Sequence, residues 1–123
     1  MNKNLKNLII DLKLDNWNEI INHNRTNKYS GASRKKKEMQ NIKYFLMNIK
    51  PIEDYPIEII CKWHIKNVNS DLDNKSLKSV LDAMQQMKIL KNDNCKCIQK
   101  ITYIAIKDTK DYLELEICSL QSK

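Results

Sequence analysis

The sequence lacks the features that mark membrane, repeat and multidomain proteins. No apolar run approaches the roughly 20 residues that a helix needs to cross a bilayer, and Met1 is followed by Asn2, Lys3 and Asn4 rather than by the apolar core of a signal peptide. No internal repeat and no linker divides the 123 residues. We therefore expect one soluble cytoplasmic domain, residues 1–123, that does not bind a membrane.

The chain also has few residues that suit a zinc site. Cys95 and Cys97 are separated by one residue, whereas structural zinc sites usually space two cysteines by about two to four residues. Only His23 and His64 add imidazoles, and Cys61 and Cys118 lie in or beside predicted strands. We expect the four cysteines to be buried or edge thiols.

Positive charge is abundant and concentrated. Between Asn24 and Lys50 the chain has eight basic residues and one acidic residue, which equals the whole net charge of +7. Such a segment suits a polyanion such as nucleic acid, or an anionic membrane surface, and a solvated helix face is the alternative. The candidate DNA-binding residues in it are Arg25, Lys28, Arg34, Lys35, Lys36 and Lys37.

Apolar spacing predicts the elements of the N-terminal half. Residues 7–14 partly alternate and predict a strand, with a helix as the competing interpretation. A short helix is expected around Trp17 to Ile21, and Gly31, the only glycine, predicts a turn. Ser33 is the expected N-cap of a longer helix whose apolar face runs to Ile49, before Pro51. That start places four basic residues, 34–37, in the first turns, where they oppose the helix dipole.

The C-terminal half predicts three strands and one helix. Residues 57–65 alternate strictly, with Glu58, Lys62 and His64 on the polar face, so we expect His64 on the solvent side or at a site rim. A helix is predicted from about Asn74 to Lys88, and strands over 100–107 and 112–118, joined by a hairpin turn at 108–111. The order β-α-α-β-α-β-β indicates an α+β domain with helices packed on a mixed sheet.

The segment from Ser70 to Asn74 carries the candidate chemistry. One interpretation is helix capping, with Asp73 or Asn74 as the cap and Asp71 as a favourable charge at the N-terminus. The other is a metal site, because two carboxylates one residue apart after a strand suit magnesium, which prefers oxygen ligands. Asp93, in a turn-like segment beyond the helix, is a third candidate ligand.

From Asp71 to Asn94 the sequence DLDNKSLKSVLDAMQQMKILKNDN resembles the RusA-type Holliday-junction resolvases, which are crossover-junction endodeoxyribonucleases common in phages and prophages. The family pattern is Asp-x-Asp-Asn, a helical lysine, a Leu-Asp-Ala step and an acidic turn. Upstream, WNEIINHNRTNKYSGASRKKKEM and PIEIICKWHI are also similar to family segments. The resemblance covers about 100 of the 123 residues.

The resemblance implies a homodimer that binds a four-way junction and nicks two opposed strands. It assigns Asp71, Asp73 and Asp93 as ligands of Mg²⁺, for which Mn²⁺ could substitute, and Lys78 as a catalytic lysine, with Asn74 and Asp82 in supporting roles.

Two departures from the family pattern bear on these assignments. The spacing from Asn74 to Asp82 looks one residue longer than in the best-known member, so Lys75 competes with Lys78, which we favour. Asn92 stands where many members carry the first of two acids, so only Asp93 is carried over. Asp93 could join Asp71 and Asp73 of its own chain or of a dimer partner, since six extended residues could return the chain by about 20 Å.

Overall fold

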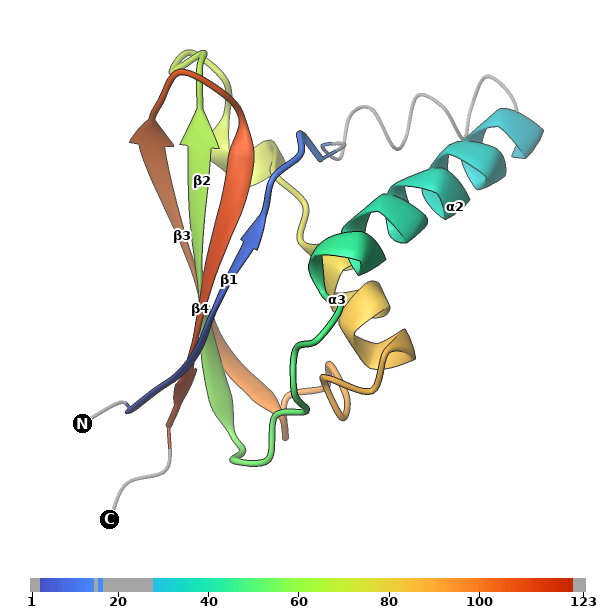
Figure 1. Ribbon diagram of the computed structural model, residues 1–123. Helices are drawn as coiled ribbons and strands as arrows, with labels where there is room; N and C mark the ends of the chain where they lie inside the picture. Colours follow the sequence, from blue (N-terminus) through green and yellow to red (C-terminus); the bar gives the residue numbers. More distant parts are fainter. Residues whose placement is uncertain (1–2, 15, 17–27, 121–123) are drawn as a thin grey trace.

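A computed structural model describes residues 3–14, 16 and 28–120 (Figure 1). Four strands and two α-helices follow in the order β1 Lys3–Ile10, α2 Lys28–Phe45, β2 Ile57–Ile65, α3 Lys78–Gln86, β3 Ile98–Lys107 and β4 Tyr112–Ser119. A short 3₁₀ helix, η1, spans Leu72–Asn74 between β2 and α3. This is the expected α+β class. The short helix predicted around residues 17–21 lies outside the described residues.

The strands form one mixed sheet in the order β1-β4-β2-β3. β2 runs parallel to β3 and antiparallel to β4, and β4 runs antiparallel to β1. Both helices lie on one face of the sheet, and α2 packs against α3 and β1 (Figure 1). The molecule therefore has two layers, with its core between the helices and the inner face of the sheet.

The core is built from the alternating face of β2 and its neighbours. Five side chains of β2 point into it, each at most 5% exposed: Ile57, Ile59, Cys61, Trp63 and Ile65. Leu113, Leu115 and Ile117 of β4 and Leu8 and Ile10 of β1 extend the same layer. Met39 and Ile42 of α2 and Leu46, directly after it, cover this layer, as do Val80, Ala83 and Met84 of α3. The predicted apolar faces of β2 and α2 are thus confirmed.

Several predicted boundaries in the N-terminal half were wrong. β1 begins and ends four residues earlier than predicted, because its partner β4 begins at Tyr112 and leaves nothing to pair beyond Ile10. Gly31 does not form a turn, and Ser33 is not the N-cap, since α2 already begins at Lys28. One glycine costs a helix only about 1 kcal/mol relative to alanine. The basic residues 34–37 therefore lie beyond the first turn, where the helix dipole opposes them less.

The C-terminal half differs from the prediction in the connection between β3 and β4. The predicted strands are confirmed, each within about two residues, but residues 108–111 are not a hairpin turn because β3 and β4 are not neighbours. The link instead crosses the end of β2. The Asp108 N–H donates to the Ile65 carbonyl at 2.9 Å, and the Lys66 N–H donates to the Asp111 carboxylate at 3.1 Å. α3 is shorter than the predicted helix at both ends.

Within the described ranges, neither helix is long and apolar enough to cross a membrane.

Truncating the central strand should test this core. Ile59 is fully buried, and Ile59→Ala removes its packing and leaves a cavity, so we expect the free energy of unfolding to fall by about 2–5 kcal/mol. Ile9→Ala is the matched control, because Ile9 is 56% exposed and its loss should cost about 0.5 kcal/mol or less. Urea unfolding measures both, and equal losses would contradict the assigned core.

Candidate functional site

Asp71 and Asp73 lie at η1, the short 3₁₀ turn that comes after β2. Asp71 precedes the turn in extended conformation and Asp73 lies within it, and both side chains are exposed. Neither caps a helix: Asp71 makes no side-chain cap hydrogen bond, and α3 begins later, with Leu77 at its N-cap. The capping interpretation of these acids, and of Asn74, is therefore wrong. Among the described residues neither carboxylate has a side-chain partner.

Asp93 lies at the other end of the sheet, in the loop that joins α3 to β3. This loop is attached to the start of β2: the Ile57 N–H donates to the Cys97 carbonyl at 2.8 Å, and the Lys91 N–H donates to the Tyr55 hydroxyl at 2.9 Å. Figure 1 shows α3 running from the η1 end of the sheet to this opposite end. The Asp93 side chain is exposed.

One chain does not bring the three acids together. β2, with nine residues, separates the η1 end from the Asp93 end and spans about 26 Å at 3.3 Å per residue. Over the described residues, no three His, Cys, Asp or Glu side chains are grouped so that they could hold a metal ion. Asp71 and Asp73 alone suit a magnesium ion that keeps most of its waters. Asp93 does not complete that pair within the same chain.

The two candidate lysines occupy different environments. Lys78, the first residue of α3, is exposed, with its ammonium 4.0 Å from the Asp82 carboxylate one turn later. Such a pair stabilises a helix by only a few tenths of a kcal/mol. Lys75 directly follows η1 and is half-buried. Its backbone N–H donates to the Leu72 carbonyl at 3.2 Å, which fixes Lys75 beside the turn that carries Asp71 and Asp73.

A basic groove lies between α2 and α3. It is lined by Lys35, Lys36, Met39, Gln40 and Lys43 of α2 and by Gln86 of α3. The Lys43 ammonium donates to the Gln86 side-chain oxygen at 2.6 Å, and the side chains of residues 35–37 are exposed. Of the other predicted DNA-binding residues, Lys28 and Arg34 belong to α2, and Arg25 lies outside the described residues. Sequence reasoning missed Lys43 and Gln86 as parts of this surface.

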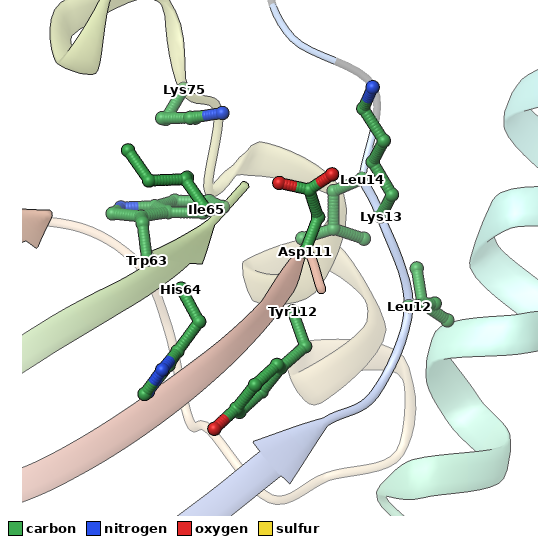
Figure 2. A pocket seen from close by; sticks show the side chains of 9 residues that line it. All are labelled: Leu12, Lys13, Leu14, Trp63, His64, Ile65, Lys75, Asp111 and Tyr112. Atoms are coloured by element: carbon green, nitrogen blue, oxygen red, sulfur yellow. The ribbon is translucent and has the colours of Figure 1, made fainter. Parts of the chain in front are cut away.

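A small pocket lies at the end of β2, near η1 (Figure 2). Its lining includes Trp63 and Ile65 of β2, Lys75 after η1, Asp111 of the link to β4 and Leu14 after β1. The Trp63 indole N–H is buried and has no hydrogen-bond partner in the described part of the chain. The pocket thus brings residues distant in sequence to the end of the sheet where Asp71 and Asp73 lie.

His64 lies on the outer face of β2. It is buried, so it does not face the solvent, but it is one of the residues that line the pocket, as the site-rim alternative predicted. Its Nδ1 is 2.9 Å from the Asp108 carboxylate and its Nε2 is 3.0 Å from the Glu114 carboxylate, and its ring stacks on Tyr112. A neutral imidazole has one N–H, so both contacts are hydrogen bonds only when both nitrogens are protonated. Asp108 and Glu114 lie on opposite sides of the ring, which does not suit a shared metal ion.

The other polar residues predicted on this face are also covered by neighbours. Glu58 is 5% exposed and accepts a hydrogen bond from the Thr102 hydroxyl at 3.0 Å, and Lys62 pairs with Glu116. Alternation identifies the face of each residue but not its cross-strand partners. The sequence signal for these partners was the alternation of Tyr112, Glu114 and Glu116, which becomes useful only once β4 is known to lie beside β2.

Burial and local contacts shift the pKa values of several groups. Burial raises the pKa of the Cys61 thiol to about 12, so it stays protonated and behaves as a core residue. Burial also raises the pKa of Tyr103 to about 12, while its contact with the Leu77 backbone opposes the shift. Cys97 and Cys118 are buried as well, and Cys95 is exposed.

No protein-family model matches this chain, and a search of the curated proteins found no match either.

The contacts of Asp108 predict an acid-dependent loss of stability. The Thr109 backbone N–H and then the His64 ring hold the pKa of Asp108 below its ordinary value of 3.8. When folding lowers the pKa of a carboxyl group, its ionised form stabilises the fold at every pH above the pKa of the unfolded state. This stabilisation is lost as the pH falls through the lower pKa of the folded state. The stability difference between wild type and Asp108→Asn should therefore narrow as the pH falls below 3.8.

Urea unfolding at a series of pH values measures this difference, and NMR titration of the Asp108 carboxyl measures its pKa directly. His64→Phe should move the titration midpoint back toward 3.8, because it keeps a ring but removes the nitrogen that contacts the carboxylate, which is the second cause of the shift. A wild-type midpoint at or above 3.8 would show that these contacts do not act as described.

Proposed function

We propose that this protein is a magnesium-dependent endonuclease that nicks branched DNA such as four-way junctions, acting as a homodimer in the cytoplasm. Mn²⁺ is the expected substitute metal. The proposal combines the resemblance of residues 71–94 to the RusA-type resolvases with the surfaces described above.

The observation that carries the proposal is the state of Asp71 and Asp73. They are exposed and lie two residues apart, Asp71 directly before η1 and Asp73 within it. Within the described structure neither side chain makes a cap hydrogen bond or an ion pair. Two carboxylates without a structural role suit a hydrated magnesium ion, which proteins commonly hold through one or two carboxylates. When bound, the ion would lower the pKa of an attacking water and stabilise charge on the leaving oxygen.

The remaining residues would bind and position the DNA. The lysines on α2 and in the groove beside α3 contact phosphates, an interaction that depends little on sequence and strongly on salt. Lys78, and Lys75 beside it, add positive charge close to the carboxylate pair. Asp82 pairs with Lys78 and limits the directions that its flexible chain adopts.

A junction-binding protein without nuclease activity is the second candidate. It is favoured by one observation: in one chain, as far as it is described, Asp93 does not join Asp71 and Asp73. Magnesium-dependent nicking of a synthetic four-way junction, compared with linear duplex of the same sequence, separates the two candidates.

Neutralising the carboxylates should separate cutting from binding. Asp71→Asn, Asp73→Asn and Asp93→Asn keep the size of the side chain but weaken metal binding, so each should lower the nicking rate by about two orders of magnitude or more. Junction binding without metal should persist or tighten, because a negative charge facing the phosphates is lost. Nicking assays and gel shifts measure the two effects.

Asp54→Asn is the matched control, because Asp54 is also exposed but belongs to none of these groups, and it should cut at the wild-type rate. Thermal melting confirms that each variant is folded. If all three folded variants cut at near the wild-type rate, the assignment of these acids is wrong.

The basic helix should determine the salt dependence of binding. Replacing Lys35, Lys36 and Lys37 together by Ala should weaken junction binding and flatten its log–log dependence on salt by about 0.9 for each phosphate that the protein no longer binds. The control variant replaces Lys6, Lys13 and Lys110, which lie outside α2 and outside the basic segment 24–50, and removes the same charge. Fluorescence anisotropy at several salt concentrations measures the slopes. Equal slopes in both variants would place the DNA on another surface.

A further inference from the structure

β3 is an edge strand with one side open. It pairs with β2 along its length, and in the described structure no other strand pairs with it. An open strand edge presents a row of unpaired N–H and carbonyl groups, which can pair with another chain. β3 has ten residues and is therefore long for an edge strand.

The backbone donors that face this edge follow from one hydrogen bond. The Asp108 N–H donates to the Ile65 carbonyl of β2. The register between β2 and β3 is regular from Lys100 to Lys107. Because donors alternate in direction along a regular strand, the even-numbered N–H groups from Lys100 to Ile106 also face β2. Those of Ile101, Tyr103 and Ala105 face the open edge.

The middle of β3 is apolar and uncharged. From Ile101 to Ile106 the sequence is ITYIAI, and Ile101 and Ile104 are 46% and 39% exposed. Lysines flank this stretch at positions 100 and 107, so the usual protection of an edge by charge is missing from its centre. The pairing of β3 with β2 has an irregularity only near the start of β3, opposite Ile57 and Glu58, so the stretch from Ile101 to Ile106 lies in a regular part of the strand.

The faces of the strand restrict how a second copy can pair. Ile101, Tyr103 and Ala105 lie opposite Ile59, Cys61 and Trp63, and so belong to the helix-covered face. Antiparallel pairing about a two-fold axis perpendicular to the sheet keeps residues of one face together. If Tyr103 lies on the axis, Ile101 of one copy lies opposite Ala105 of the other. The backbone N–H groups of these two residues, which face the open edge, can then donate to carbonyl groups of the other copy.

We infer that β3 pairs antiparallel with β3 of a second copy, and that this pairing completes the proposed nuclease site from two chains. The second part rests on the proposed function; the pairing itself does not. Asp93 precedes the start of β3, whereas η1, which carries Asp73 and follows Asp71, packs against β3 and belongs to the end of the sheet where β2 finishes. Antiparallel pairing places the start of one β3 beside the end of the other, so Asp93 of each copy approaches Asp71 and Asp73 of its partner.

The pairing is tested by Ala105→Pro. Proline removes an N–H that faces the open edge and not β2, so the chain should keep its fold and become a monomer, while wild type and the control Ala105→Val are dimers. Ile104→Lys is a second variant, which places a charge in the apolar centre at an exposed position. Analytical ultracentrifugation measures the oligomeric state, and circular dichroism the fold.

Amide exchange gives an independent measurement on the wild-type protein. The N–H groups of Ile101, Tyr103 and Ala105 should be protected in the dimer and should exchange rapidly in folded Ile104→Lys. A wild-type monomer at micromolar concentration, rapid exchange of these three amides in wild type, or a dimer that persists in both variants would overturn the pairing.

Mixing two inactive variants tests the shared site. A mixed dimer of Asp71→Asn and Asp93→Asn chains has one intact site if the acids meet across the two-fold axis, and none if each site belongs to one chain. After the two variants are mixed in mild denaturant and refolded, random pairing should restore about a quarter of the wild-type nicking rate. Asp71→Asn mixed with Asp73→Asn is the control and should stay inactive, since its mixed dimers contain no intact site.

These outcomes separate failure of the shared site from failure of the proposed function. Active wild type with no rescue in the Asp71→Asn and Asp93→Asn mixture would refute the shared site and leave the nuclease proposal standing. Wild type that does not nick any branched substrate would refute the nuclease function and the shared site together, while ultracentrifugation and amide exchange would still decide the pairing of β3.

Discussion

The parallel pairing of β2 with β3 is the constraint on which the rest of the structure depends. β2 also pairs antiparallel with β4, so it is the one strand of the described sheet that joins parallel and antiparallel neighbours along its length. Its inner face is almost fully buried in the core, and β3 and β4 pair with it on its two sides. A parallel neighbour requires the chain to cross from the end of β2 back to its beginning, which α3 accomplishes.

This crossover explains why the candidate acids are separated. Residues that directly follow β2 lie at one end of the sheet, and residues that directly precede β3 lie at the other. Asp71 and Asp73 belong to the first group and Asp93 to the second. The chain from α3 to Asp93 is long enough to return toward Asp71, but it does not do so. The loop after α3 is hydrogen-bonded to residues 52–57, before and at the start of β2. The topology therefore makes a second chain the natural source of the third acid in the proposed site.

Much of the fold could be predicted from the sequence, because alternation and helical spacing report burial within one element. β2 matched its predicted bounds, Ile57–Ile65, and Met39 and Ile42 of α2, with Leu46 directly after it, belong to the predicted buried face. Strand order could not be predicted in this way. A four-residue link such as 108–111 is typical of a hairpin, and only the packing of β2 between β3 and β4 makes it a crossing instead.

The candidate site could also be predicted only as far as local sequence determines it. The sequence predicted that Asp71, Asp73 and Lys75 follow the strand 57–65, and in the structure they lie at the end of this strand, β2. It could not show that α3 begins at Lys78 and leaves the acids without a capping role, because Asp73 and Asn74 are equally good caps by residue type. The partners of His64 were also hidden, since Asp108 and Glu114 are more than 40 residues away and meet it only through the strand order.

The two faces of the sheet also differ in charge, and this difference favours one docking side for the DNA that we propose as substrate. On the outer face acids and bases neutralise one another: Lys62 pairs with Glu116, Lys100 with Glu58, and His64 lies between Asp108 and Glu114. On the helix layer, lysines 35–37 are exposed, and the groove beside α3 has no acid among the described residues that line it. A polyanion is attracted to the layer whose charge is not neutralised. Antiparallel pairing through β3 leaves the helices of both copies on the same side of a continuous sheet, so the basic helices of the two chains would face one DNA molecule together.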